Sequence, residues 1–213
     1  MSRLAIFGAG GFGREVITVA RADRRELVLV ADERAPDFDG IPVLSFDQLR
    51  DDDEMVIAIG DPAVRRRIAA RWHRFTSVFA PSFVMGRRVE VGEGAIFCDF
   101  SMVTSSARIG RHFHCNTFSG VAHDCVIGDF VTFAGSVRCN GNVHVGDGAY
   151  IGPGAVLRSG SARRPLLIGE GAVVGMGAVV TRNVPPHTTV FGNPATALPR
   201  PAGRAGADQS HAH

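Results

Sequence analysis

The chain has 213 residues and a formal net charge of +2 at pH 7, so we expect one large domain or two small ones and no nucleic-acid or membrane partner. No apolar run reaches the length of a membrane span. The four cysteines lack CxxC spacing, which favours free thiols over a zinc site. The N-terminus enters a predicted strand without room for a signal peptide, and we expect a cytoplasmic protein.

The first predicted elements form a strand–loop–helix–strand unit. Residues 4–7 are a short apolar strand, 8–15 read GAGGFGRE, 16–22 have a helical pattern, and 27–31 are a second strand that ends at Asp32. Glycines in such a loop let backbone N–H groups approach a phosphate at a helix N-terminus. Asp32 is placed to accept hydrogen bonds from a ribose or a base. This pattern predicts a Rossmann-like nucleotide-binding α/β domain over residues 1–78.

Three interpretations of the glycine loop stay open. The GxGxxG spacing of Gly8, Gly10 and Gly13 suits a dinucleotide site. However, only one further strand (55–60) and one further helix (62–72) follow, so a second half to hold a nicotinamide is missing. A nucleotide-sugar site is therefore favoured over NAD, and over a tight turn that binds nothing.

Charged residues near the end of this domain are expected at the surface. The acidic run 51–54 reads as a solvated turn. The arginines of the following helix, Arg65, Arg66, Arg67 and Arg71, read as an exposed face that could also attract phosphate.

A six-residue repeat dominates the rest of the chain. Every sixth residue from Val91 to Leu157 is aliphatic, aromatic or a cysteine, small residues recur two positions earlier, and glycines recur every eighteen residues at Gly92, Gly110, Gly128 and Gly146. Neither a helix nor a plain alternating strand has this period. It predicts a parallel β-helix with three short strands per turn, over residues 79–198. Glycine is expected to permit the tight bends.

Two segments depart from the repeat. Between Leu157 and Ile168 the rhythm slips by five residues, which predicts a loop that bulges from one coil. Residues 199–213 are rich in Pro, Gly, Ala and polar residues, and we expect a disordered tail.

The pair His123–Asp124 is the candidate catalytic group. A histidine at a coil corner projects outward, where it can act as a base, and an adjacent carboxylate can orient the ring. Neighbouring residues on a straight strand point in opposite directions, so the pair cooperates only if the backbone turns there. His112 and His114 have a spacing that could bind metal but read as solvated, and His144 faces outward. A γ-class carbonic anhydrase would need a histidine at Gly128, so no metal is expected.

Several segments resemble the NeuD/PglD-like family of hexapeptide-repeat sugar O/N-acetyltransferases. The matching segments are GAGGFGRE at the start, AIGD at 58–61, HDCVIGDF at 123–130, CNGNVHVGDGAYIG at 139–152 and FGNPA at 191–195. They cover nearly the whole chain in the family's order.

The resemblance implies a left-handed β-helix, a homotrimer, acetyl-CoA bound between neighbouring coils and a nucleotide-linked amino sugar held by the first domain. By motif position it implies His123 as general base with Asp124 as its modulator, sugar-nucleotide contacts at Gly10, Gly11, Phe12, Asp32, Glu33, Gly60 and Asn116, and CoA contacts at Thr132, Gly141, Pro153 and Met176. The N–H of Gly141, one coil on from His123, would bind the oxyanion.

The predicted function is acetyl-CoA-dependent N-acetylation of a nucleotide-linked amino sugar by direct transfer. Bacillosamine-type members carry histidine where Phe12 and Thr132 stand, so the sugar and the nucleotide stay open. Two alternatives remain: an O-acetyltransferase of sialic acid or another glycan, and a non-catalytic trimeric scaffold that senses a nucleotide.

Overall fold

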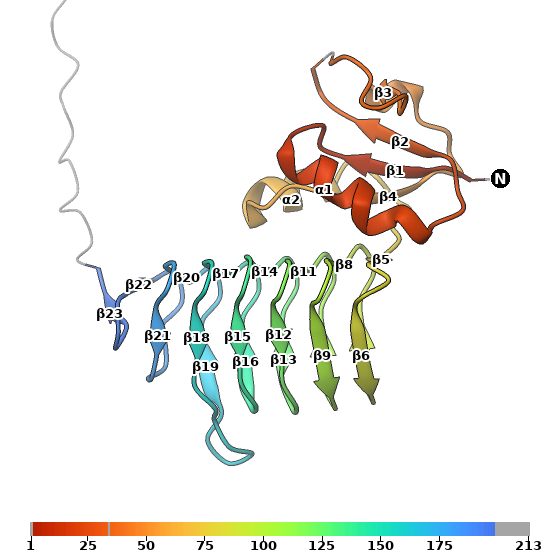
Figure 1. Ribbon diagram of the computed structural model, residues 1–213. Coiled ribbons are helices and arrows are strands. Elements are labelled where there is room, and N and C mark those ends of the chain that lie inside the picture. The colour runs from red at the N-terminus through yellow and green to blue at the C-terminus, as the bar shows by residue number, and fades with distance from the viewer. Residues whose placement is uncertain (1, 34, 199–213) are drawn as a thin grey trace, which may run out of the picture.

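The computed structural model describes residues 2–33 and 35–198. The chain has two halves: the first contains helices and strands, and the second, which begins with the strand at Val78, contains strands only. The predicted tail, 199–213, lies outside the described residues. Figure 1 shows a small sheet with two helices above one end of a long stack of coils. Among the described residues, no helix has the length and apolar character needed to cross a membrane.

The first half is a four-stranded parallel sheet in the order β3-β2-β1-β4. Its elements are β1 (Leu4–Phe7), α1 (Gly11–Val19), η1 (Ala20–Ala22), β2 (Leu27–Val30), β3 (Val43–Leu44), η2 (Phe46–Gln48), β4 (Glu54–Ile57) and α2 (Pro62–Ala69). The central strands are apolar on both faces because α1 packs on one face and α2 on the other. Burial on both sides explains why β1 reads as a continuous apolar run.

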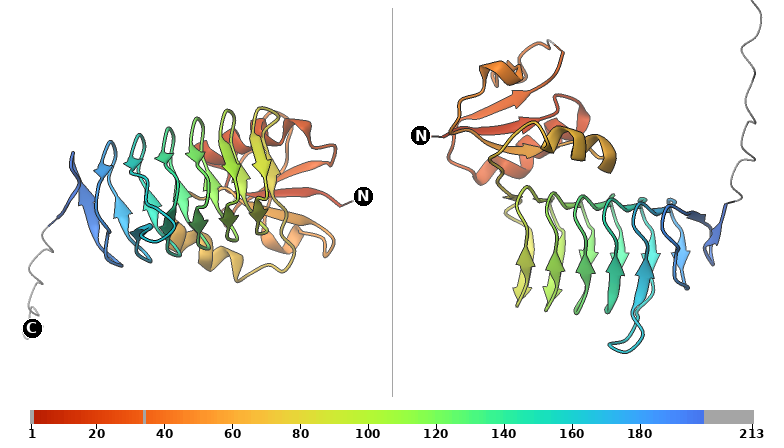
Figure 2. Two further views of the ribbon diagram at one scale, coloured as in Figure 1. Left: turned by 90° about the horizontal axis from the view of Figure 1, so that it is seen from below. Right: turned by 180° about the vertical axis from the view of Figure 1, so that it is seen from behind.

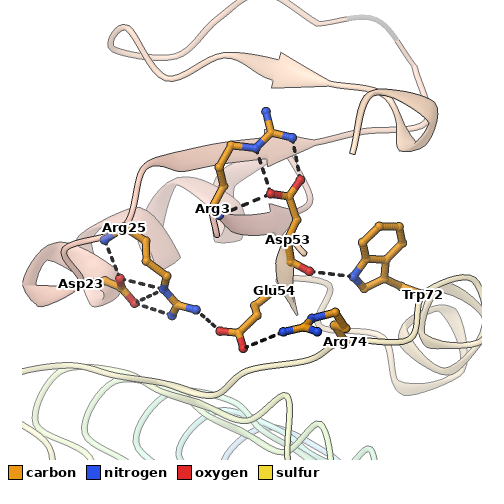
Figure 3. Close-up of polar contacts among 7 residues, drawn as sticks. All are labelled: Arg3, Asp23, Arg25, Asp53, Glu54, Trp72 and Arg74. Carbon is orange, nitrogen blue, oxygen red and sulfur yellow. Dashed lines mark hydrogen bonds and ion pairs between the residues drawn. The ribbon is translucent and has the colours of Figure 1, made fainter. Parts of the chain in front are cut away.

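The acidic run at 51–54 is only partly solvated, contrary to expectation. Asp51 and Asp52 are exposed, but Asp53 is fully buried and its Oδ2 accepts a hydrogen bond from Arg3 Nη2 at 2.6 Å. Its backbone carbonyl accepts from Trp72 Nε1 (Figure 3). This buried pair fixes the start of β4 against the start of β1, since an unpaired carboxylate there would be costly.

The second half is a three-sided parallel β-helix. Its strands are β5 (Val78–Phe79), β6 (Val84–Arg87), β7 (Glu90–Val91), β8 (Ile96–Phe97), β9 (Met102–Ser105), β10 (Arg108–Ile109), β11 (His114–Cys115), β12 (Gly120–Val121), β13 (Val126–Ile127), β14 (Thr132–Phe133), β15 (Arg138–Cys139), β16 (Val143–Val145), β17 (Tyr150–Ile151), β18 (Val156–Leu157), β19 (Leu166–Ile168), β20 (Val173–Val174), β21 (Val179–Val180), β22 (Thr189–Phe191) and β23 (Thr196–Ala197).

Three sheets make the sides of the β-helix. The domain-facing sheet has the order β23-β22-β20-β17-β14-β11-β8-β5, the second sheet β21-β18-β15-β12-β9-β6, and the third sheet β19-β16-β13-β10-β7. Along the regular part, partners are eighteen residues apart, as in Val121↔Cys139. The prediction of a parallel β-helix with three strands per coil is therefore confirmed, and its stacked coils are visible from two sides in Figure 2.

The residues of the six-residue repeat form the interior of the coils. From Phe97 to Leu157 they are all buried, and Phe97 packs against Phe83 and Phe113. The predicted bulge runs between β18 and β19, where Ser161 and Arg164 bridge, and it projects away from the first domain (Figures 1 and 2).

The predicted role of the repeated glycines is wrong. Gly92, Gly110, Gly128 and Gly146 have no positive φ; a Cβ on Gly110 would instead lie 2.5 Å from the carbonyl carbon of Gly128 in the next coil. Close stacking of coils, not a tight bend, is what requires glycine. The left-handed corner positions are held mostly by other residues, such as Phe118 and Asp124.

Candidate active site

His123 and Asp124 occupy the corner between β12 and β13. The backbone turns at Asp124, whose φ is +56°, so both side chains lie on the same side. His123 Nδ1 and Asp124 Oδ2 are 2.8 Å apart, and the side chains are 59% and 56% exposed. A neutral ring that donates its Nδ1–H to this carboxylate leaves the Nε2 lone pair free to accept a proton.

Gly141, one coil further along the stack, lies under the His123 ring. A Cβ at Gly141 would be 2.5 Å from Cε1 and 2.6 Å from Nε2 of that ring. Its carbonyl accepts a hydrogen bond from the N–H of Gly160, but its own N–H donates to no residue within 2–33 or 35–198. The glycine that lies against the imidazole ring thus has a backbone N–H without a partner among the described residues.

Two glycines of the glycine loop are in close backbone contact, and two others have open space around them. A Cβ on Gly13 would be 1.7 Å from the Gly8 carbonyl oxygen, so these two glycines close the turn. Gly10 and Gly11 are exposed, and a Cβ on either would meet nothing within 4 Å. Phe12 is half-buried and contacts the His114 ring, with centroids 5.2 Å apart.

Asp32 and Glu33 follow the carboxyl end of β2 and line a cleft of about 920 Å³, which Val43 and Leu44 of β3 also line. Asp32 receives two hydrogen bonds from Arg71, at 2.7 and 3.0 Å. This guanidinium lowers the pKa of Asp32 below its ordinary value, although desolvation opposes the shift. Asp32 is therefore ionised, and Glu33 beside it is exposed.

Arg65 was expected at the surface, and that prediction is wrong. Its side chain is 0% exposed, inserted between the first domain and the β-helix. It donates to carbonyl oxygens of both halves, including Ile59 at 2.6 Å and Phe130 at 2.8 Å. Burial lowers its pKa to about 9, opposed by the charge of Asp61. Helix periodicity alone cannot show that a second domain covers this face.

The prediction of solvated histidines at 112 and 114 is wrong for the same reason. Both rings are buried under the first domain. His114 Nε2 lies 2.9 Å from the carbonyl oxygen of Ile57, and His112 stacks on Phe130. Burial, followed by the charge of Arg65, lowers the pKa of His112 to about 4. His144 is exposed, as predicted.

The predicted CoA contacts fall in three places. Pro153 and Met176 are exposed on neighbouring coils of one corner, where the Gly177 N–H donates to the Pro153 carbonyl at 2.8 Å. Gly141 lies at the His123 corner. Thr132 is 1% exposed and faces the first domain, where its Oγ1 donates to the Gly60 carbonyl oxygen at 2.8 Å. Asn116 is half-buried, and its Oδ1 finds no hydrogen-bond partner in the described parts of the chain.

Known proteins resemble this chain along almost its whole length. The model of the PglD N-terminal domain matches residues 3–72. GDP-perosamine N-acetyltransferase from Escherichia coli O157:H7 is 40% identical over 216 residues, which cover 94% of this chain and 98% of that protein. The chain belongs to the NeuD/PglD-like family of sugar acetyltransferases. The predicted family is therefore confirmed.

Solved structures of this family have the same fold. WeeI from Acinetobacter baumannii AYE matches with a TM-score of 0.87 and 41% identity over 93% of this chain and all of that one. PerB from Caulobacter crescentus, in complex with CoA and GDP-perosamine, matches with a TM-score of 0.80 and 26% identity over 93% and 98%. The predictions of an acyltransferase, of acetyl-CoA as acyl donor and of N-acetylation of a nucleotide-linked amino sugar are confirmed. Among the described residues, no cluster of three His, Cys, Asp or Glu side chains is arranged to hold a metal.

Proposed function

We propose that this acetyltransferase N-acetylates GDP-perosamine or a closely similar GDP-linked amino sugar, with His123 as general base. The proposed substrate rests on the 40% identity to a GDP-perosamine N-acetyltransferase across 94% of the chain. His123 is supported as the base by the 2.8 Å contact between its Nδ1 and Asp124 Oδ2, which leaves the Nε2 lone pair free on a side chain that is 59% exposed.

The chemistry follows from this corner. His123 Nε2 accepts a proton from the sugar amine as the amine attacks the thioester carbonyl, and Asp124 keeps the ring in the required tautomer. The free N–H of Gly141 donates to the oxygen that gains charge as the tetrahedral intermediate forms. The thiolate of CoA then leaves, and the proton held by His123 is passed to it or to water.

Direct transfer needs no acyl-enzyme, and the state of Cys98 and Cys115 fits this proposal. All four are buried. Burial raises the pKa of Cys98 to about 12 and also raises the pKa of Cys115, so both stay as neutral thiols, which are poor nucleophiles.

The first domain supports a Rossmann-like nucleotide site. Its parallel strand order β3-β2-β1-β4 is the first part of the order found in dinucleotide folds, in which ligands bind beyond the carboxyl ends of the strands. Gly10 and Gly11 leave open space at the N-terminus of α1 for a diphosphate. Asp32, Glu33 and Gly60 lie at the same edge, and we propose them as contacts for the nucleoside.

A homotrimer of left-handed β-helices would complete the site. Val84 and Met102 point outward from the second sheet, and the exposed rings of Phe100 and Phe118 stack beside it with centroids 5.2 Å apart. Such a contiguous apolar patch is typical of a subunit interface. Packing of chains along it would create grooves for CoA between coils, with Gly141, Pro153 and the 72% exposed Met176 as contacts, and Asn116 near the sugar.

Turnover tests this proposal directly. The protein is incubated with acetyl-CoA and, in separate reactions, with GDP-perosamine and with UDP-, dTDP- and CMP-linked amino sugars, while thiol release is recorded. We expect the highest kcat/KM with GDP-perosamine, and a fall of at least about a hundredfold for His123→Ala, the lower range of a lost general base. A higher kcat/KM with another nucleotide sugar would overturn the proposed substrate. A fall in kcat/KM of less than tenfold for His123→Ala would overturn the proposed base. Light scattering should give three times the chain mass of 22.6 kDa.

A further inference from the structure

The turn after β4 is tied to the β-helix by an unusual set of hydrogen bonds. The Gly60 carbonyl oxygen accepts from Thr132 Oγ1 at 2.8 Å and from Arg65 Nη1 at 3.3 Å. One residue earlier, the Ile59 carbonyl accepts from the same Nη1 at 2.6 Å. His114 Nε2, also on the domain-facing sheet, makes a 2.9 Å hydrogen bond to the Ile57 carbonyl. Three carbonyl groups at the carboxyl end of β4 are thus held by side chains.

Thr132 connects Arg65 to Gly60. Arg65 Nη2 donates to Thr132 Oγ1 at 3.0 Å, and the same hydroxyl donates to Gly60. A threonine hydroxyl carries one proton, and this proton is already used. Thr132 Oγ1 therefore has no proton left to donate to a CoA molecule, which is the contact that motif position alone implies for it.

Arg65 is fixed in place by carbonyl groups of both halves. Besides Ile59 and Gly60 it donates to the carbonyls of His112 at 3.0 Å and Phe130 at 2.8 Å. None of its hydrogen-bond partners among the described residues is a carboxylate. A buried guanidinium without a hydrogen-bonded carboxylate is expensive, and an apolar side chain would fill such a space at lower cost. What the arginine adds is geometry: its planar donors define the distance and angle between α2 and the coils.

We propose that Thr132 and Arg65 are positioning residues that hold the Gly60 turn, and with it the nucleotide-binding edge of the first domain, at a fixed place on the β-helix. The inference rests on the proposed function, since that edge is where the nucleotide is placed. Ligands of open α/β sheets bind beyond the carboxyl ends of the strands, and β4 ends at this turn. If the turn is loosened, the nucleotide sugar therefore binds more weakly, whereas the binding of the acyl donor is unchanged.

The test compares Thr132→Val with Thr132→Ser. Valine keeps the shape and removes the hydroxyl, so both the bond to Gly60 and the bond from Arg65 are lost; serine keeps both. For the valine variant we expect KM and Kd for GDP-perosamine to rise about tenfold, a change that the loss of these two hydrogen bonds can supply. KM for acetyl-CoA and kcat should stay within twofold, and serine should restore the wild-type values. Thr189→Val, in β22 and away from the interface, is the matched control.

Hydrogen exchange supplies a readout that does not depend on turnover. Peptides that cover residues 58–64 should exchange faster in Thr132→Val than in Thr132→Ser, with the coils after β14 unchanged. If Thr132→Val raised KM for acetyl-CoA and left KM for the nucleotide sugar unchanged, Thr132 would be a contact for acetyl-CoA, and the proposal would be overturned. Unchanged exchange at 58–64 would overturn it as well. Absence of turnover by the wild-type protein refutes the proposed function alone, and the exchange result still decides the role of Thr132.

Discussion

Substitution of Gly141 by alanine tests the geometry of the proposed catalytic corner. The new Cβ would lie 2.5 Å from Cε1 and 2.6 Å from Nε2 of His123, well inside contact distance. Gly141 does not have a left-handed φ, so the alanine backbone is unstrained. The ring must therefore move, and because it is 59% exposed it can swing into solvent without disturbing the core.

The structure allows the size of both effects to be worked out. A displaced ring loses its contact with Asp124 and its place beside the Gly141 N–H, which the alanine retains. Loss of a general base costs at least about a hundredfold, which corresponds to about 2.7 kcal/mol in the activation barrier. The free energy of unfolding should change by no more than about 0.5 kcal/mol, as for other surface substitutions.

The assay is thiol release at saturating acetyl-CoA and GDP-perosamine, with thermal melting in parallel. Gly135→Ala is the matched control, because a Cβ there would lie 3.6 Å from the Thr117 carbonyl oxygen, an ordinary contact; we expect its kcat within twofold of wild type. A Gly141→Ala kcat within threefold of wild type would show that the ring position is not needed. A fall in kcat together with a large drop in Tm would refute the argument that the ring moves freely.

Two further predictions concern stability. Phe97→Ala removes a fully buried ring that packs against Phe83 and Phe113, and urea denaturation should show a loss of about 3–5 kcal/mol; a loss below about 1 kcal/mol would contradict the packing. Arg21 donates two hydrogen bonds to Asp99 across the two halves and, with Ser82, lowers the pKa of Asp99. A carboxyl with a lowered folded pKa stabilises the fold above its unfolded pKa of about 3.9 and loses this effect as pH falls through the folded value. The difference in Tm between wild type and Asp99→Asn should therefore shrink as pH falls from 6 to 3, and a constant difference would refute this.

The repeat was predictable because each coil buries the same positions. Every sixth residue from Phe97 to Leu157 faces the interior, so the period that is visible in the sequence is the period of the fold. The glycine spacing was also visible, but its cause was not. Close approach between Gly110 and Gly128 depends on the distance between coils. This distance cannot be inferred from the local sequence around each glycine.

The interface between the halves escaped prediction because it joins distant segments. His114 and Thr132 are outward positions of the domain-facing sheet, which would be solvated on an isolated β-helix. One signal was available: Ile96 occupies the same outward column as His114 and is fully apolar. An isoleucine at an outward position indicates that something covers that sheet, and the buried Arg65 follows from the same cover.

At the far end of the domain-facing sheet, β23 turns back and pairs antiparallel with β22. All other neighbouring strands of that sheet pair in parallel. An open end of this kind is a template on which a second molecule can add, so that chains join head to tail into filaments. The short reversed strand replaces the parallel edge of β22 with an antiparallel one, which disfavours such addition on the domain-facing sheet.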